Sequence, residues 1–275
     1  GDPTYRLDGD VVWRGIRTPS GAATLQVRAQ AADGDVHAEA WGPGATWALD
    51  HVPAMLGSDD DATDFRPDLH PLVAEAWRRR QVRFGAGHRL WEALVPAVIE
   101  HKVTGQEAFA GFRRLVHRYG ERAPGPGGDL RLWVQPDAAT VRGVPSWEWL
   151  RMHIDPARSR TLVRAAAVAD SLDRLTRDDA DTKLRTLPGV GEWTSAEVRS
   201  RVFGDPDAVS FGDYHVAKDI GWAVTGEPFD DDQLREFLAP WRPQRNRAAM
   251  LIHGLAGGRP RHGPRMAPRT HLPAG

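Results

Sequence analysis

The chain contains 275 residues, carries a formal net charge of −1 and has no cysteine. The lack of cysteine excludes disulfides, thiolate metal sites, iron–sulfur clusters and cysteine nucleophiles. No apolar run approaches the roughly 18 residues that a membrane helix needs, and no signal-peptide pattern is present, so we expect a soluble, cytoplasmic protein.

Charge is distributed unevenly along the chain. Residues 1–75 contain 5 Lys/Arg and 13 Asp/Glu, whereas residues 76–275 contain 31 and 24. A basic excess of this kind is typical of a phosphate-binding surface, but a solvated, arginine-rich surface produces it as well. The charge pattern alone leaves both interpretations open.

The N-terminal part of the chain predicts short β-strands. Partial alternation of apolar and polar residues marks 11–13, 24–29 and 36–41, with Gly, Pro, Asp and Ser turns between them. Residues 57–64 are acidic and polar, and we expect a loop there. Helical patterns dominate afterwards, over 72–84, over 91–119 as two helices broken near 103–105, and over 137–185 beyond a breaker segment at 123–129.

These patterns predict an α+β fold with a β-rich N-terminal domain over 1–84 and an all-α body over 85–256. The tail over 257–275 is rich in Pro, Gly, Arg and His, and we expect it to be disordered.

The most informative motif is an apolar-Pro-Gly-apolar-Gly run between two predicted helices. It reads Leu187-Pro188-Gly189-Val190-Gly191 and lies in a predicted hairpin over 185–198. Two glycines allow the tight backbone of a short hairpin, and they leave amides uncovered at a helix N-terminus, where a DNA phosphate can bind. An ordinary helix–helix turn is the alternative interpretation.

A second motif lies about 20 residues further on. Phe211-Gly212-Asp213-Tyr214-His215 places an acid just before a predicted helix. An Asp there is a common N-cap, and capping is the alternative to a chemical role.

Together, the hairpin, the following loop and Asp213 resemble the signature of the helix-hairpin-helix DNA glycosylases, and within them the DNA-3-methyladenine glycosylase II group. The resemblance covers about residues 85–255, and it implies a mostly helical glycosylase body beside a small β-containing domain. It implies an enzyme that flips an alkylated base out of duplex DNA and hydrolyses its N-glycosidic bond. Damaged double-stranded DNA would be the partner of a monomeric, nucleoid-associated protein that uses neither a membrane nor a nucleotide cofactor.

The resemblance assigns roles to individual residues. Asp213 would be the catalytic carboxylate, and Trp193 stands where the superfamily's lyase members carry a Schiff-base lysine, so no lyase step is expected. The remaining assignments are pocket residues Trp193, Tyr214 and His253; DNA-binding residues His101, Lys102, Thr104, Gly189, Val190, Gly191 and Thr194; and backbone carbonyls of Arg185, Leu187 and Val190 for a monovalent cation, with no cofactor required. Core packing is the alternative for Trp193 and the expected role of Tyr214 and His215.

Several positions depart from the family pattern. Lys102 occupies the wedge position, where an apolar residue is common, and His101 replaces a usual glutamine. Glu192 is acidic where a basic residue is frequent. His253 and Gly254 replace two pocket aromatics, which leaves the preferred lesion open.

Three other functions compete with this one. A non-catalytic helix-hairpin-helix DNA-binding protein, or a glycosylase for another lesion, would fit the altered pocket. A metal hydrolase could use some of the 11 histidines, but they are scattered and form no His-Glu-x-x-His pattern.

Overall fold

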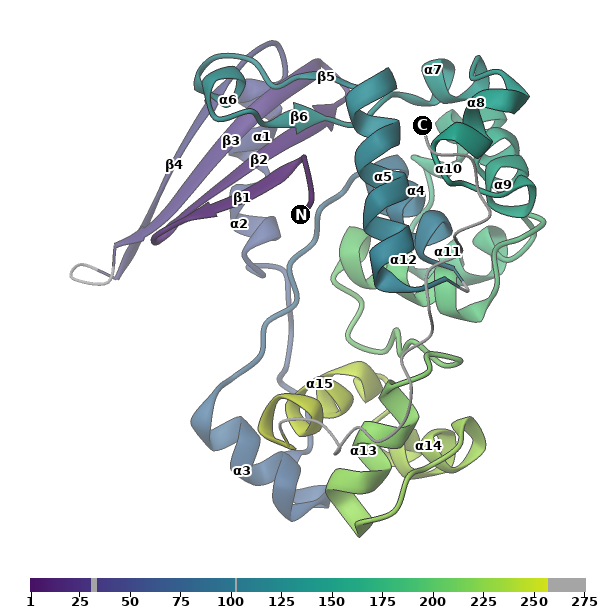
Figure 1. The fold of residues 1–275 in the computed structure, drawn as a ribbon. Helices are drawn as coiled ribbons and strands as arrows, with labels where there is room; N and C mark the ends of the chain where they lie inside the picture. The colour runs from purple at the N-terminus through teal and green to yellow at the C-terminus, as the bar shows by residue number, and fades with distance from the viewer. Residues whose placement is uncertain (31–33, 102, 257–275) are drawn as a thin grey trace.

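The structure is a computed structural model that describes residues 1–30, 34–101 and 103–256. Lys102 and the predicted disordered tail over 257–275 lie outside the described residues. Three bodies are visible in Figure 1: a sheet, a helical cluster beside it, and a second helical cluster below both.

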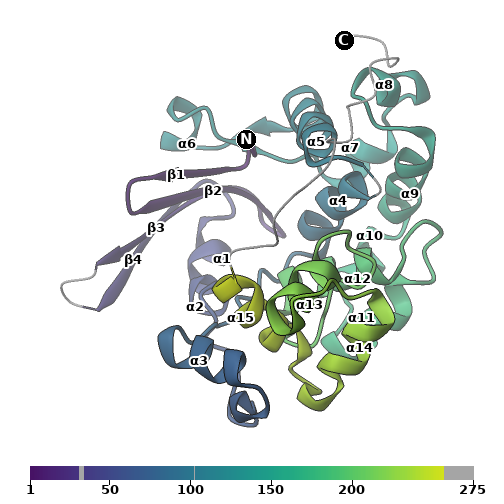
Figure 2. The ribbon, with the colours of Figure 1, turned by 60° about the horizontal axis from the view of Figure 1, so that its bottom comes forward.

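The N-terminal body is a four-stranded antiparallel sheet in the order β1-β2-β3-β4. Its strands are β1 (Tyr5–Asp8), β2 (Val11–Thr18), β3 (Gly21–Gln30) and β4 (Asp35–Trp41). The helices α1 (Ala45–Asp50) and α2 (Val52–Met55) follow, and their apolar residues share a small core with Ile16, Ala23 and Leu25. The β3–β4 end of the sheet points away from both helical clusters (Figure 2).

The three predicted strands are therefore confirmed, and the acidic segment 57–64 is a loop as expected. The sequence analysis did not predict β1, a strand of only four residues that buries none of its side chains.

The larger helical cluster is built around α4 (Leu90–Glu100), whose side chains are mostly buried. A helix that is apolar on nearly all sides belongs at the centre of a core. The elements of this cluster and its small hairpin are α5 (Gly105–Tyr119), β5 (Glu121–Arg122), α6 (Pro126–Asp129), β6 (Trp133–Val134), α7 (Ala138–Arg142), α8 (Ser146–Arg151), α9 (Pro156–Ala167), α10 (Ala169–Leu172), α11 (Arg177–Leu184) and α12 (Glu192–Phe203).

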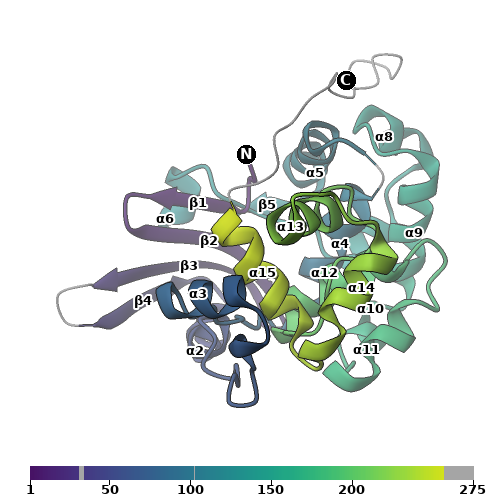
Figure 3. The same cartoon turned by 90° about the horizontal axis from the view of Figure 1, so that it is seen from below.

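The second helical cluster joins segments that are far apart in sequence. Its helices are η1 (Pro67–Leu69), α3 (Pro71–Arg79), α13 (Val216–Thr225), α14 (Asp231–Leu238), η2 (Ala239–Trp241) and α15 (Arg245–Ala256). Figure 3 shows α15 between α3 and α13, and Val73 of α3 shares a core with Ile252 of α15.

The predicted boundary at residue 84 remains a prediction. However, α3 precedes that boundary and packs with the C-terminal helices rather than with the sheet. The predicted all-α body also contains the short β5–β6 pair, and the Trp133 amide of β6 donates to the Pro3 carbonyl at 2.9 Å.

In the described residues, no helix is both long enough and apolar enough to span a membrane.

A buried ion pair holds the second helical cluster to the segments that enter and leave α3. Arg247 of α15 is 0% exposed; it donates to Asp60 Oδ1 at 2.5 Å, to Gln244 Oε1 at 2.6 Å and to the Val82 carbonyl. Asp60 is itself nearly fully buried, and its Oδ2 has no hydrogen-bond partner among the described residues. The carboxylate of Asp60 therefore depends on Arg247 for compensation.

Removing Arg247 should be costly for stability. We expect Arg247→Met to lower the free energy of unfolding by about 3–5 kcal/mol, because it leaves a buried carboxylate unpaired. Adding Asp60→Asn should restore part of the loss. Urea unfolding followed by circular dichroism measures both, with Arg66→Met as the matched control, because the Arg66–Asp68 pair is exposed. Equal losses for Arg247→Met and Arg66→Met would contradict this account.

Candidate DNA-binding hairpin and carboxylate site

The predicted hairpin lies between α11 and α12, where residues 185–191 form a tight turn. The Val190 amide donates to the Leu187 carbonyl at 2.9 Å, and the Leu187 amide donates to the Leu184 carbonyl at 3.0 Å. Gly189 has φ +98°, and a Cβ there would collide with Thr161 Oγ1 of α9. Glycine is therefore required at this position by both backbone conformation and space.

The N-terminus of α12 is open to an incoming anion. Gly191 is the N-cap of α12, and a Cβ added to it would meet no atom within 4 Å. The first amides of a helix lack intrahelical acceptors and carry a partial positive charge, so they suit a phosphate oxygen.

Two of the predicted DNA-binding residues can act only through their main chain. The Thr194 side chain is 0% exposed, and the Val190 side chain is buried in the core around α4. The Thr194 side chain faces the protein interior at this position of α12, so its DNA-binding role stays a prediction that only its main chain could fulfil. Thr104, in turn, caps α5: its Oγ1 accepts from the Glu107 amide at 3.2 Å in a capping box.

Trp193 brings the hairpin to the end of α4. Its side chain is half-buried, and its ring centroid lies 6.3 Å from that of His101. The hairpin thus adjoins the turn that carries the predicted wedge position. His253 is exposed on α15, and within the described chain no recorded contact joins it to Trp193 or Asp213.

Asp213 lies in the aspartate loop, which we define as residues 204–215 between α12 and α13. Its Oδ1 accepts from the His215 amide at 2.7 Å and from the Val216 amide at 3.2 Å. Its Oδ2 forms no hydrogen bond with any described residue. The carboxylate is half-buried, so one oxygen caps α13 while the other stays available. The capping and chemical interpretations are therefore compatible.

The neighbours of Asp213 do not pack in the core, contrary to the expectation for them. Tyr214 is 68% exposed, and His215 is exposed too. Their rings meet edge to face at 5.0 Å, and Lys218 Nζ lies 3.5 Å from the Tyr214 ring centroid. Both residues directly precede α13, and the part of the chain that the structure describes leaves both of them exposed.

The aspartate loop is held from two sides. Ser210 Oγ donates to Glu197 Oε1 of α12, and the Gly212 amide donates to Asp231 Oδ1 of α14 at 3.0 Å. The loop is therefore attached to the same helix that begins at the hairpin.

Arg235 of α14 connects the hairpin to this loop directly. Its guanidinium donates two hydrogen bonds to the Glu192 carboxylate, at 2.7 and 2.6 Å, and lies 3.9 Å from the Phe211 ring centroid. The Arg235 hydrogen bond holds the pKa of Glu192 below its usual value. Glu192, which departs from the family pattern, is thus neutralised by a partner 43 residues away that the sequence analysis did not identify.

The proposed cation carbonyls all lie in the hairpin turn. The Leu187 carbonyl accepts the Val190 amide, which leaves one of its lone pairs. Among the side chains of the described residues, no group of three or more His, Cys, Asp or Glu is placed to hold a metal.

Comparison with known proteins finds a sequence relative and structures of similar fold. No family model matches the chain. It is 30% identical over 258 residues to a Mycobacterium tuberculosis protein named "probable bifunctional transcriptional activator/DNA repair enzyme AlkA". That match covers 77% of this chain and 48% of the relative, so the chain spans about half the length of that protein.

Solved structures share the fold. A 3-methyladenine DNA-glycosylase from Archaeoglobus fulgidus matches with a TM-score of 0.75 at 16% identity, over 91% of this chain and 88% of that one. A Clostridium acetobutylicum 8-oxoguanine glycosylase/lyase in complex with double-stranded DNA matches with a TM-score of 0.63 at 11% identity, over 91% and 96%. The chain therefore has the fold of these DNA glycosylases, and it carries both the hairpin and the aspartate loop on which the sequence resemblance rests.

Proposed function

We propose that this chain is a monofunctional DNA glycosylase that removes alkylated bases from duplex DNA and leaves an abasic site. The observation that carries the proposal is the state of Asp213: one carboxylate oxygen caps α13, and the other is unbonded on a loop attached to the hairpin helix. The names of the mycobacterial relative and of the archaeal structure support a DNA-repair role and an alkylated purine as the substrate.

The reaction requires cleavage of an N-glycosidic bond through a state in which the sugar carries positive charge. The free Oδ2 of Asp213 would stabilise that charge electrostatically and orient or deprotonate the attacking water. The capping bonds to Oδ1 and the anchors at Ser210 and Gly212 hold the carboxylate in place before the substrate arrives. An alkylated purine that carries positive charge is already a good leaving group, so little acid catalysis is needed.

The hairpin and Trp193 would bind the damaged strand. The amides at the start of α12 suit a phosphate, and the half-buried indole suits stacking on a flipped, electron-poor base. His101 beside it, with Lys102 next in the chain, would meet the DNA around the flipped nucleotide.

A monovalent cation would be held by the carbonyls of Arg185, Leu187 and Val190, where its charge would help to bind a phosphate. No other cofactor is proposed. The protein would act as a monomer on the nucleoid, with damaged duplex DNA as its partner.

The first prediction tests the carboxylate. Asp213→Asn should reduce base release by at least about 100-fold, because the amide removes the negative charge that faces the developing cation. Thermal stability should stay nearly unchanged, because the Asn side-chain oxygen still accepts the capping bonds. Single-turnover release of methylated purines from methylated duplex DNA measures the rate. The control is Asp232→Asn, an exposed acid in the first turn of α14. Full activity of the Asp213 variant would show that the assigned chemistry is wrong.

The second prediction concerns strand cleavage. Trp193 has no amine, so the reaction should stop at the abasic site. We expect free methylpurine in the supernatant, identified by mass spectrometry, with strand breaks only in the aliquot heated in alkali. Breaks before alkali that disappear in Asp213→Asn would contradict the monofunctional assignment, whereas breaks that persist in that variant would reveal a contaminating nuclease. Salt-sensitive duplex binding without release of any base would favour a non-catalytic DNA-binding protein.

A further inference from the structure

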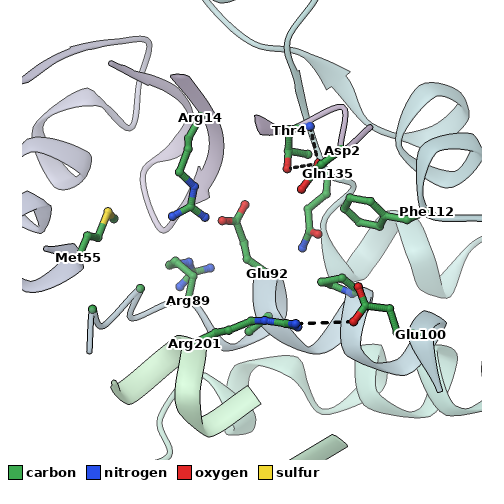
Figure 4. Close-up of a pocket in the computed structure, with 14 residues that line it drawn as sticks. Asp2, Thr4, Arg14, Met55, Arg89, Glu92, Glu100, Phe112, Gln135 and Arg201 are labelled. Atoms are coloured by element: carbon green, nitrogen blue, oxygen red, sulfur yellow. Dashed lines mark hydrogen bonds and ion pairs between the residues drawn. The ribbon is translucent and has the colours of Figure 1, made fainter. Parts of the chain in front are cut away.

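A cavity of about 440 Å³ lies between the sheet and the helical cluster around α4. Its walls come from β2, from the segment before α4, and from α4, α5 and α12 (Figure 4). Ala93, Pro96 and Phe112 supply apolar surface, while charged side chains supply most of the rest. The volume is in the range of pockets that enclose small ligands.

Most of the charged groups in this cavity already have partners. Arg89 pairs with Asp173 at 3.1 Å and donates to the Arg17 carbonyl at 2.9 Å. Arg201 pairs with Glu197 at 2.7 Å and with Glu100 at 3.6 Å. Arg14 on β2 and Glu92 on α4 also line the cavity, and neither forms an ion pair with a described residue.

Arg14 and Glu92 point toward one another across the cavity in Figure 4. Glu92 Oε1 accepts the Arg17 amide at 2.6 Å, and its Oε2 has no hydrogen bond with a described residue. The Arg14 guanidinium forms neither a hydrogen bond nor an ion pair with any residue that the structure describes. Burial raises the pKa of the Glu92 carboxyl, and the nearby charge of Arg14 opposes that rise. The Oε2 acceptor of Glu92 and the guanidinium N–H donors of Arg14 therefore face the same cavity.

The cavity adjoins the candidate site at two places. Arg201 in its wall shares Glu197 with Ser210 of the aspartate loop. Glu100, also in its wall, directly precedes His101, whose ring lies near that of Trp193. The cavity wall thus includes residues of the helix that begins at the hairpin and of the helix that ends just before His101.

We propose that this cavity receives the flipped purine, with Glu92 accepting an N–H of the base and Arg14 donating to a ring nitrogen or carbonyl oxygen. The inference rests on the proposed function and deepens it: the pocket recognises the base edge through a donor–acceptor pair from α4 and the N-terminal sheet. Apolar surface on Ala93, Pro96 and Phe112 suits the faces of a planar ring.

Glu92→Gln is the sharpest test, because glutamine keeps an acceptor for the Arg17 amide but removes the charge and replaces the second acceptor oxygen with an NH2 donor. We expect single-turnover release of methylpurine to fall about 10-fold or more, the loss typical of a hydrogen bond to a charged group. Affinity for a duplex with an abasic-site analogue should stay within about twofold, because that duplex has no base to recognise. Arg14→Gln should behave in the same way. Glu39→Gln, on the exposed face of β4, is the matched control.

Each outcome decides between the two proposals. If wild-type protein releases base and both variants release it at the same rate, the inference is wrong and the proposed function stands. If the variants lose affinity for the abasic duplex to the same degree as activity, they act on DNA binding or folding and the inference is overturned.

If wild-type protein releases no base from methylated DNA, the proposed function fails. Calorimetric titration with free 3-methyladenine then tests the cavity alone: binding that Glu92→Gln abolishes supports it, and absent or unchanged binding overturns it.

Discussion

The arrangement of the candidate site depends on one guanidinium, that of Arg235. It joins Glu192 at the start of the hairpin helix to Phe211 in the aspartate loop, so it sets the distance between the helix end proposed to bind a phosphate and the Asp213 carboxylate. A bidentate pair fixes direction as well as distance, which a single hydrogen bond does not. The pairing with Arg235 lowers the pKa of Glu192 in the folded protein. The Arg235–Glu192 pair therefore stabilises the fold fully above the pKa that Glu192 has in the unfolded chain. This stabilisation is lost as the pH falls through the lower pKa that Glu192 has in the folded protein.

In Asp213, one side chain combines a structural role with the chemical role proposed for it. Its Oδ1 caps α13 through two amide donors, and this places its Oδ2 with little rotational freedom. A carboxylate that is already oriented needs no rearrangement when charge develops on the substrate. The helix cap, which by itself would be an ordinary feature, here serves to preorganise the group proposed to act.

The bodies of the molecule meet around polar contacts rather than one continuous core. The buried Arg247–Asp60 pair attaches α15 to the acidic loop, and the Glu92 carboxylate on α4 accepts the Arg17 amide of β2. The sheet thereby becomes a wall of the cavity beside the hairpin helix. This placement accounts for a β-containing domain in a protein whose proposed chemistry is carried by helices.

By itself the sequence determined the local elements and the two motifs. Periodicity located the three longer strands and the α4–α5 break, and the glycines of the hairpin predicted the turn because Gly189 adopts a backbone that other residues avoid. These signals depend on neighbours within a few positions along the chain. The resemblance to a family then singled out Asp213 and Trp193, whose proposed roles await experiment.

Only the tertiary structure decided which distant side chains meet. It paired Glu192 with Arg235, buried Thr194, exposed Tyr214, packed α3 with the C-terminal helices and set Arg14 opposite Glu92. None of these is visible in a local pattern, because burial and long-range pairing depend on how helices and strands pack and not on the residues beside them in sequence.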